Sequence, residues 1–175
     1  MAFDSAIDKG GAYASGSVAL FLAAASILIA LGFQYIGGYL PCALCLMERY
    51  AYYAAIPLLF VAIALSSGGN KGWAAALFFV VALAFLANAG LGAYHAGAEW
   101  KFWPGPATCG GDNALATSAG SLLKDIEGIK IVRCDEASIV FLGLSFAGWN
   151  VIASLLLMAL SLKAAFSSAE ARRLT

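Results

Sequence analysis

The stretch that decides how this chain is organised is Pro41-Cys42-Ala43-Leu44-Cys45-Leu46-Met47-Glu48-Arg49, at the start of a long apolar run. Proline is favoured in the first turn of a helix, so we predict a helix that begins at Pro41. In that helix Cys42, Cys45 and Arg49 share one face. The positive end of the helix dipole and the nearby guanidinium both stabilise a thiolate. A charge at the depth of Arg49 is costly in a bilayer and indicates a functional site. The stretch therefore predicts thiol–disulfide chemistry at a membrane surface.

The composition places the whole chain in a membrane. Its 175 residues are 62% hydrophobic and only 11% charged. A soluble domain of this length needs far more polar surface. Because a spanning helix needs about 20 apolar residues, we predict spans at 17–36, 46–65, 73–94 and 144–165. Short connections make neighbouring helices antiparallel. We expect an all-α membrane protein: a single domain over 1–175, folded as a four-transmembrane-helix antiparallel bundle with a long outer loop at 96–143.

The distribution of basic residues predicts the orientation of this bundle. The formal net charge is zero, and no nucleic-acid partner is expected. Basic residues lie near both ends of the chain and in the short second connection: Lys9, Lys71, Lys163, Arg172 and Arg173. The positive-inside rule then places both termini in the cytoplasm and the cysteines on the outer side. The first apolar run is longer than a signal-peptide core, so it is interpreted as a retained anchor.

Four cysteines indicate two pairs. Cys42, Cys45, Cys109 and Cys134 all fall on the predicted outer side, where an even number of cysteines suggests disulfides. Cys42–Cys45 is one pair and Cys109–Cys134 the other. The second pair could equally be a structural link. The first closes almost no loop, and its spacing is typical of redox-active pairs. No metal site is expected, because a second CxxC is missing and His95 is not at ligand spacing.

Two further patterns concern the outer loop and the polar residues of the spans. Leu115, Leu122, Ile126 and Ile129 recur with helical spacing. They predict a short amphipathic helix that lies on the membrane or covers the end of the bundle. Three polar residues of the spans are interpreted mainly as polar contacts between helices: Gln34, Asn88 and Asn150.

Several of these residues, taken together, resemble a known family. The residues that carry the resemblance occur in a fixed order along the chain. They are Phe33-Gln34, the Pro41–Arg49 stretch, Tyr94-His95, Trp103-Pro104 before Cys109, and Cys134 followed by Phe141-Leu142-Gly143-Leu144. This order is similar to that of the bacterial disulfide-bond-formation protein B (DsbB) family. The resemblance covers about Phe33 to Leu144. The start of the loop between Cys109 and Cys134 departs from it by being rich in glycine and alanine.

The resemblance implies a membrane thiol oxidase of the bacterial inner membrane. Such an enzyme reoxidises a periplasmic DsbA-like thiol oxidase and passes the electrons to the quinone pool of the lipid, either ubiquinone or menaquinone. By resemblance, Cys109 forms the mixed disulfide with the partner and Cys134 exchanges with Cys42. Cys45 is then the thiolate that faces the quinone.

The resemblance also assigns the residues around the quinone. Arg49 holds or polarises it, His95 and Gln34 line the site, and Glu48 orients Arg49. Two other functions stay open. One is a vitamin-K-epoxide-reductase-like enzyme, in which we expect the CxxC late in the bundle. The other is a non-catalytic membrane scaffold with structural disulfides.

Overall fold

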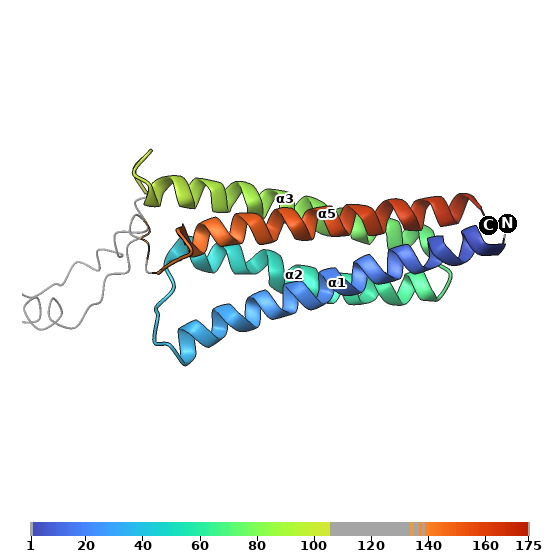
Figure 1. The fold of residues 1–175 in the computed structure, drawn as a ribbon, viewed down its shortest axis with the longest axis horizontal. Coiled ribbons are helices and arrows are strands. Elements are labelled where there is room, and N and C mark those ends of the chain that lie inside the picture. The colour runs from blue at the N-terminus through green and yellow to red at the C-terminus, as the bar shows by residue number, and fades with distance from the viewer. Residues whose placement is uncertain (1, 106–133, 135–136, 138, 175) are drawn as a thin grey trace, which may run out of the picture.

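The computed structural model describes residues 2–105, 134, 137 and 139–174, with the backbone alone for 2–10. Four long helices run antiparallel along one axis, and a two-stranded hairpin precedes the last of them (Figure 1). The helices are α1 (Ala2–Tyr35), α2 (Ala43–Ser67), α3 (Lys71–Glu99) and α5 (Phe146–Arg173), and the strands are β1 (Val140–Phe141) and β2 (Leu144–Ser145). The chain ends lie together at one end of the bundle, away from the hairpin (Figure 1).

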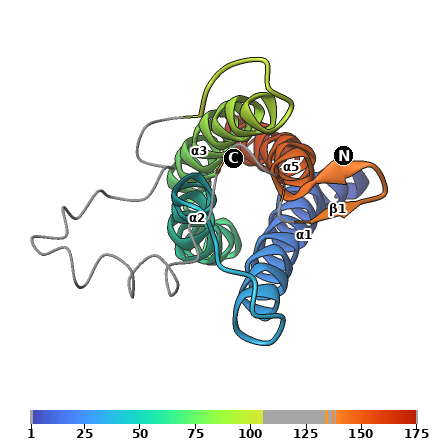
Figure 2. The same cartoon turned by 90° about the vertical axis from the view of Figure 1, so that its left-hand side faces the viewer.

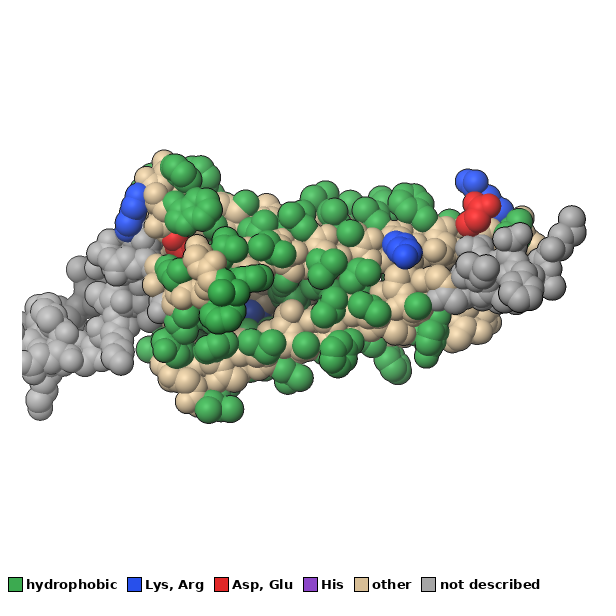
Figure 3. Space-filling model, in the orientation of Figure 1, with side chains coloured by type: hydrophobic (Ala, Val, Ile, Leu, Met, Phe, Trp, Pro, Cys, Tyr) green, Lys and Arg blue, Asp and Glu red, His purple; other side chains and the backbone are tan. Residues whose placement is uncertain are grey.

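The four predicted spans are confirmed. The segments that are long and apolar enough to cross a membrane are Gly11–Tyr35, Ala43–Ser67, Lys71–Glu99 and Phe146–Arg173. Hydrophobic side chains dominate the visible face of the bundle, and charged ones are few (Figure 3). Lipid is as apolar as these side chains, so such a surface is stable only in a membrane. The predicted amphipathic helix of the outer loop lies outside the described residues.

The helices form a ring in the order α1, α2, α3, α5, in which each packs on two neighbours (Figure 2). Large side chains fill its centre, among them Phe78, Phe85, Leu59 and Leu157. Buried alanines such as Ala19, Ala23, Ala74 and Ala164 line the contacts. Small residues let helix backbones approach closely, which is how helices associate in lipid.

The start of α2 differs from the prediction. The helix begins at Ala43, and Cys42 is its N-cap, with extended backbone angles of φ −75° and ψ 171°. Pro41 therefore precedes the helix instead of lying in its first turn. An extended Cys42 allows its sulfur to accept the backbone N–H of Cys45, at 3.2 Å. This satisfies a donor that the first turn of every helix leaves unpaired.

The hairpin before α5 was not predicted. Leu142 and Gly143 both have positive φ, at 53° and 82°, as a two-residue turn between antiparallel strands requires. The Trp149 indole N–H holds the hairpin by donating to the Phe141 carbonyl at 2.9 Å. The Ser145 hydroxyl then caps α5. The fourth span consequently begins at Phe146, because the predicted residue 144 belongs to β2.

Candidate active site

The CxxC pair lies at the end of the bundle that carries the hairpin. Both thiols are free, and their sulfurs are 2.9 Å apart. Cys42 is buried and Cys45 is partly buried. The hydrogen bond with the Cys45 thiol is the main cause that lowers the pKa of Cys42, to about 4. Contacts with His95 and with the Cys45 N–H lower this pKa further, and burial opposes them. Cys42 is therefore the thiolate of the reduced pair near neutral pH.

His95 of α3 connects this sulfur pair to two carboxylates. Its Nε2 lies 3.6 Å from the Cys42 sulfur, and its Nδ1 lies 2.9 Å from Glu48 Oε1. Only 2% of His95 is exposed. Glu48 accepts a hydrogen bond from His95 Nδ1–H, and His95 stabilises the Cys42 thiolate when Nε2 also carries a proton and donates it to the sulfur. The structure thus places His95 and Glu48 beside the CxxC pair, although His95 is not among the residues that line the cavity described below.

Arg49 lies on another side of α2 and contacts α1. Its guanidinium donates a hydrogen bond to the side-chain oxygen of Gln34. In the described part of the chain, the ionic partner of Glu48 is His95 and not Arg49. Adjacent residues of a helix point about 100° apart, so Glu48 faces α3 while Arg49 faces α1. The expectation that Glu48 orients Arg49 is thus replaced: Gln34 is the residue that positions Arg49.

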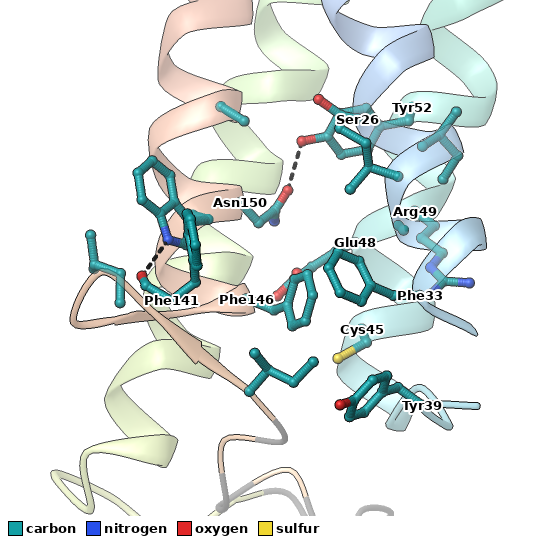
Figure 4. Close-up of a pocket in the computed structure, with 17 residues that line it drawn as sticks. Ser26, Phe33, Tyr39, Cys45, Glu48, Arg49, Tyr52, Phe141, Phe146 and Asn150 are labelled. Carbon is teal, nitrogen blue, oxygen red and sulfur yellow. Dashed lines mark hydrogen bonds between the residues drawn. The ribbon is translucent and has the colours of Figure 1, made fainter. Parts of the chain in front are cut away.

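A cavity of about 700 Å³ opens between α1, α2, α5 and the hairpin. Cys45, Glu48 and Arg49 line it together with aromatic and aliphatic side chains (Figure 4). The Phe33 and Phe146 rings meet edge to face in its wall, with centroids 5.0 Å apart. The hairpin contributes Ile139, Phe141 and Leu144. The cavity is thus mainly apolar, with a few convergent polar groups, as is typical of small-molecule sites.

The second cysteine pair is described only in part. Cys134 is disulfide-bonded and 1% exposed. It packs in one buried cluster with Cys42 and Leu44. Cys109 lies outside the described residues, so its predicted pairing with Cys134 stays a prediction.

A polar network lies deeper in the bundle, where the cavity ends. The Tyr52 hydroxyl donates to Asn150 Oδ1 at 2.7 Å, and Asn88 Nδ2 donates to Ser154 Oγ at 3.0 Å. These bonds join α2 to α5 and α3 to α5. The prediction that Asn88 and Asn150 make polar contacts between helices is confirmed.

The sequence interpretation missed Glu99. Its Oε1 lies 3.9 Å from His95 Nε2, and 6% of its side chain is exposed. The spacing carried the signal, because residues four apart on a helix share a face, so Glu99 had to accompany His95. Three ligand atoms suited to a metal also meet here: the sulfurs of Cys42 and Cys45 and a ring nitrogen of His95 lie within 4.8 Å of one another.

The structure combines four spans, a CxxC pair whose Cys42 caps a helix, and a disulfide-bonded cysteine packed on that pair. These features define a membrane protein of thiol–disulfide chemistry. A family model described as "Disulfide bond formation protein DsbB" matches residues 14–164. The chain belongs to the DsbB family and is thus a membrane protein of disulfide-bond formation. Comparisons with curated proteins and with solved structures gave no match.

Proposed function

We propose that this protein oxidises a DsbA-like dithiol partner in the periplasm and passes the electron pair to a membrane quinone. One observation carries the proposal: the two sulfurs of a single CxxC have different neighbours. Cys42 is buried with Cys134, whereas Cys45 lines the cavity that Arg49 also lines. Electrons can therefore arrive at Cys42 and leave from Cys45.

The cavity fits a quinone headgroup. Its volume of about 700 Å³ and its aromatic wall suit a flat, mostly apolar ring. Arg49 supplies a cation that stays charged in low dielectric, and Cys45 supplies the sulfur. A bound quinone accepts two electrons and two protons. Arg49 would hold it, with Gln34 fixing the guanidinium.

The entry of electrons is an exchange of disulfides. The partner's two thiols become a disulfide as the Cys109–Cys134 disulfide becomes two thiols. Cys134 then attacks the Cys42 sulfur of an oxidised CxxC, and the bond to Cys45 breaks. Cys109 next attacks Cys134, so the loop disulfide re-forms and Cys42 leaves as a thiolate. The low pKa of Cys42 favours this last departure, because a more acidic thiol leaves faster.

The exit of electrons needs a route for protons. His95 Nε2 faces Cys42, and His95 Nδ1 faces Glu48, which lines the cavity. Protons released by the sulfur pair can pass along this chain into the cavity. Arg49 can stabilise negative charge that develops between Cys45 and the acceptor.

Redox energetics support a membrane oxidant. A DsbA-type couple lies near −120 mV, whereas an oxidising glutathione pool lies at roughly −180 to −210 mV. Oxidation of that couple by such a pool is uphill by about 3–4 kcal/mol. A quinone dissolved in lipid removes this obstacle. The quinone is either ubiquinone or menaquinone.

The deciding experiment mixes purified protein, reduced DsbA-like partner and a soluble quinone, and follows quinol formation. Turnover that needs all three components supports the proposal. Oxidation of the partner without quinol formation contradicts it. A structural scaffold predicts no turnover at all and a Cys42–Cys45 bond that resists mild reductant. A vitamin-K-epoxide-reductase-like enzyme is expected to carry its CxxC late in the bundle, whereas here the pair lies at the start of α2.

A further inference from the structure

We infer that the reduced Cys42–Cys45 pair and His95 form a binding site for a thiophilic divalent cation such as Zn²⁺. The site goes beyond the proposed function, because it binds neither quinone nor a thiol partner. Its three ligand atoms, two sulfurs and a ring nitrogen, lie within 4.8 Å of one another. The sequence argued against a metal because His95 is far from a ligand spacing. The packing of α3 on α2 brings it there instead.

The spacing of these atoms suits a tetrahedral ion. Zinc binds thiolate sulfur at about 2.3 Å and imidazole nitrogen at about 2.0 Å, so neighbouring ligand atoms lie about 3.5–3.8 Å apart. Cys42 Sγ and His95 Nε2 are already 3.6 Å apart. The two sulfurs, at 2.9 Å, need to separate by a little under 1 Å. Rotation of the Cys45 side chain on the first turn of α2 can supply that distance.

Glu48 completes the pattern of a metal-binding histidine. Such histidines usually donate their second ring N–H to a carboxylate, which fixes the ring and increases its basicity. Glu48 Oε1 lies 2.9 Å from His95 Nδ1, and both side chains are more than nine-tenths buried. The ring is therefore held with Nε2 directed at the sulfur before any ion arrives.

Glu99 supplies a second, independent indication. Its side chain is 6% exposed, and its Oε1 lies 3.9 Å from His95 Nε2. Its Oε2 is buried and has no hydrogen-bond partner among the described residues. A buried carboxylate oxygen without a partner is costly. Glu99 lies outside the group of three ligand atoms that already meet. A rotation of its side chain toward a cation held by these three atoms would give the oxygen a partner, so we assign Glu99 as the fourth ligand.

Binding depends on the redox state without changing it. The reduced pair offers two sulfurs, and any proton on the thiols or on His95 Nε2 leaves when the ion binds. The disulfide offers no thiolate, so the ion is released when the pair is oxidised. A bound ion also engages a lone pair of each sulfur, so neither sulfur is free to react. It therefore holds the protein in the reduced state and inhibits turnover reversibly.

The test is a titration of the full chain in detergent with Co²⁺, which reports tetrahedral thiolate coordination by its visible and charge-transfer absorption. The protein is first reduced with a phosphine. We expect one Co²⁺ per chain, displaced by Zn²⁺, and no such spectrum from oxidised protein. Because reduction also frees the other cysteines, the double variant Cys109→Ser/Cys134→Ser is titrated in parallel and should still bind one ion.

Variants of the ligands separate this site from unspecific thiol binding. His95→Gln should weaken Co²⁺ binding by at least about 100-fold, and Glu48→Met by about 10–100-fold, the range for outer-shell changes. Glu170→Met is the matched control, because Glu170 is an exposed carboxylate at the other end of the bundle. Its Co²⁺ affinity should equal that of the wild type. Circular dichroism of each oxidised variant checks that the helices are retained.

Three results would overturn the inference. They are equal binding by reduced and oxidised protein, unchanged binding by folded His95→Gln, and loss of binding in the variant that lacks only Cys109 and Cys134. All of these are read without quinone or partner. Failure of the metal site is therefore distinguishable from failure of the proposed function.

Discussion

Cys42 and Cys134 are packed together in one buried cluster, although one caps α2 and the other comes just before the hairpin. In the proposed exchange, Cys134 and Cys42 are the two residues that form the disulfide between the two cysteine pairs. Burial shields this contact from water and from thiols in solution. In the proposed exchange, transfer between the two cysteine pairs is therefore local.

Replacement of Cys45 should separate electron entry from electron exit. In Cys45→Ser, Cys42 can still exchange with Cys134, but the cavity loses its sulfur. We expect quinol formation to fall to background while the disulfide of Cys134 stays intact. Quinol absorbance and thiol mass mapping measure the two effects. Near-normal turnover in this variant would refute the role of Cys45.

Arg49 should control the quinone step alone. Arg49→Lys keeps the charge but loses the planar fork, so we expect weak activity with a raised KM for quinone. Arg49→Met should slow the step by about 10²–10³-fold, as when one transition-state donor is removed. Gln34→Leu should raise KM by less, because it frees the guanidinium without removing it.

The control for these variants is Lys163→Met, which removes an exposed basic residue from α5. Thiol exchange with the partner should remain normal in every variant. If Arg49→Met reduces quinone at the wild-type rate, Arg49 is structural and the quinone site lies elsewhere.

The charge of Cys42 should depend on His95. The pKa of Cys42 is lowered from about 9 to about 4, so wild-type Cys42 remains a thiolate as the pH falls from about 8 to about 5. His95→Gln removes one of the contacts that lower this pKa and should raise it. The ultraviolet absorbance of the thiolate, measured against Cys42→Ser, should then decrease at a higher pH than in wild type. Identical titration curves would show that His95 does not act on the sulfur.

Gly97 should be intolerant of any side chain. A Cβ there would collide with the Trp103 ring, which stacks on Tyr94 and donates to its carbonyl. Gly97→Ala should therefore destabilise the fold by about 1–3 kcal/mol, the usual cost of overpacking. Gly90→Ala is the matched control on the same helix, because a Cβ at Gly90 meets nothing within 4 Å. Thermal unfolding in detergent compares the two, and equal midpoints would contradict the packing at Trp103.

Both termini are predicted to face the cytoplasm. They lie at the same end of the bundle, together with the short α2–α3 connection that precedes Lys71 (Figure 1). A fluorescent protein fused after Thr175 should fluoresce, and alkaline phosphatase fused there should be inactive. Fusions in the loop that contains Cys109 should behave in the opposite way. Active phosphatase at the C-terminus would reverse the orientation and place the cysteines in the cytoplasm.

Much of the fold was predictable because lipid imposes a simple rule. Apolar runs long enough to cross a bilayer must be helical, and this located all four spans. The ends of the spans were harder to predict from the sequence. The sulfur of Cys42 acts as a cap only in a folded chain, so the predicted helix begins two residues too early, at Pro41. The hairpin turn at Leu142 and Gly143 is short and apolar, and it resembled the start of a span.

The site residues were predictable from the motif, but their partners were not. Cys42, Cys45 and Arg49 follow from spacing on a single helix. The pairing of Glu48 with His95, and of Arg49 with Gln34, depends on how α3 and α1 pack against α2. That packing is set by the complementarity of many small side chains, and no local pattern in the sequence records it.

The hydrogen bond at the N-cap of α2 depends on the oxidation state of Cys42. In the reduced protein the Cys45 amide donates to an anionic sulfur, which is a strong acceptor. Once that sulfur joins a disulfide, it becomes neutral and accepts poorly. Each turnover of the proposed reaction would therefore loosen and then tighten the first turn of α2. Hydrogen exchange at this single amide would read the oxidation state of the protein from its backbone alone.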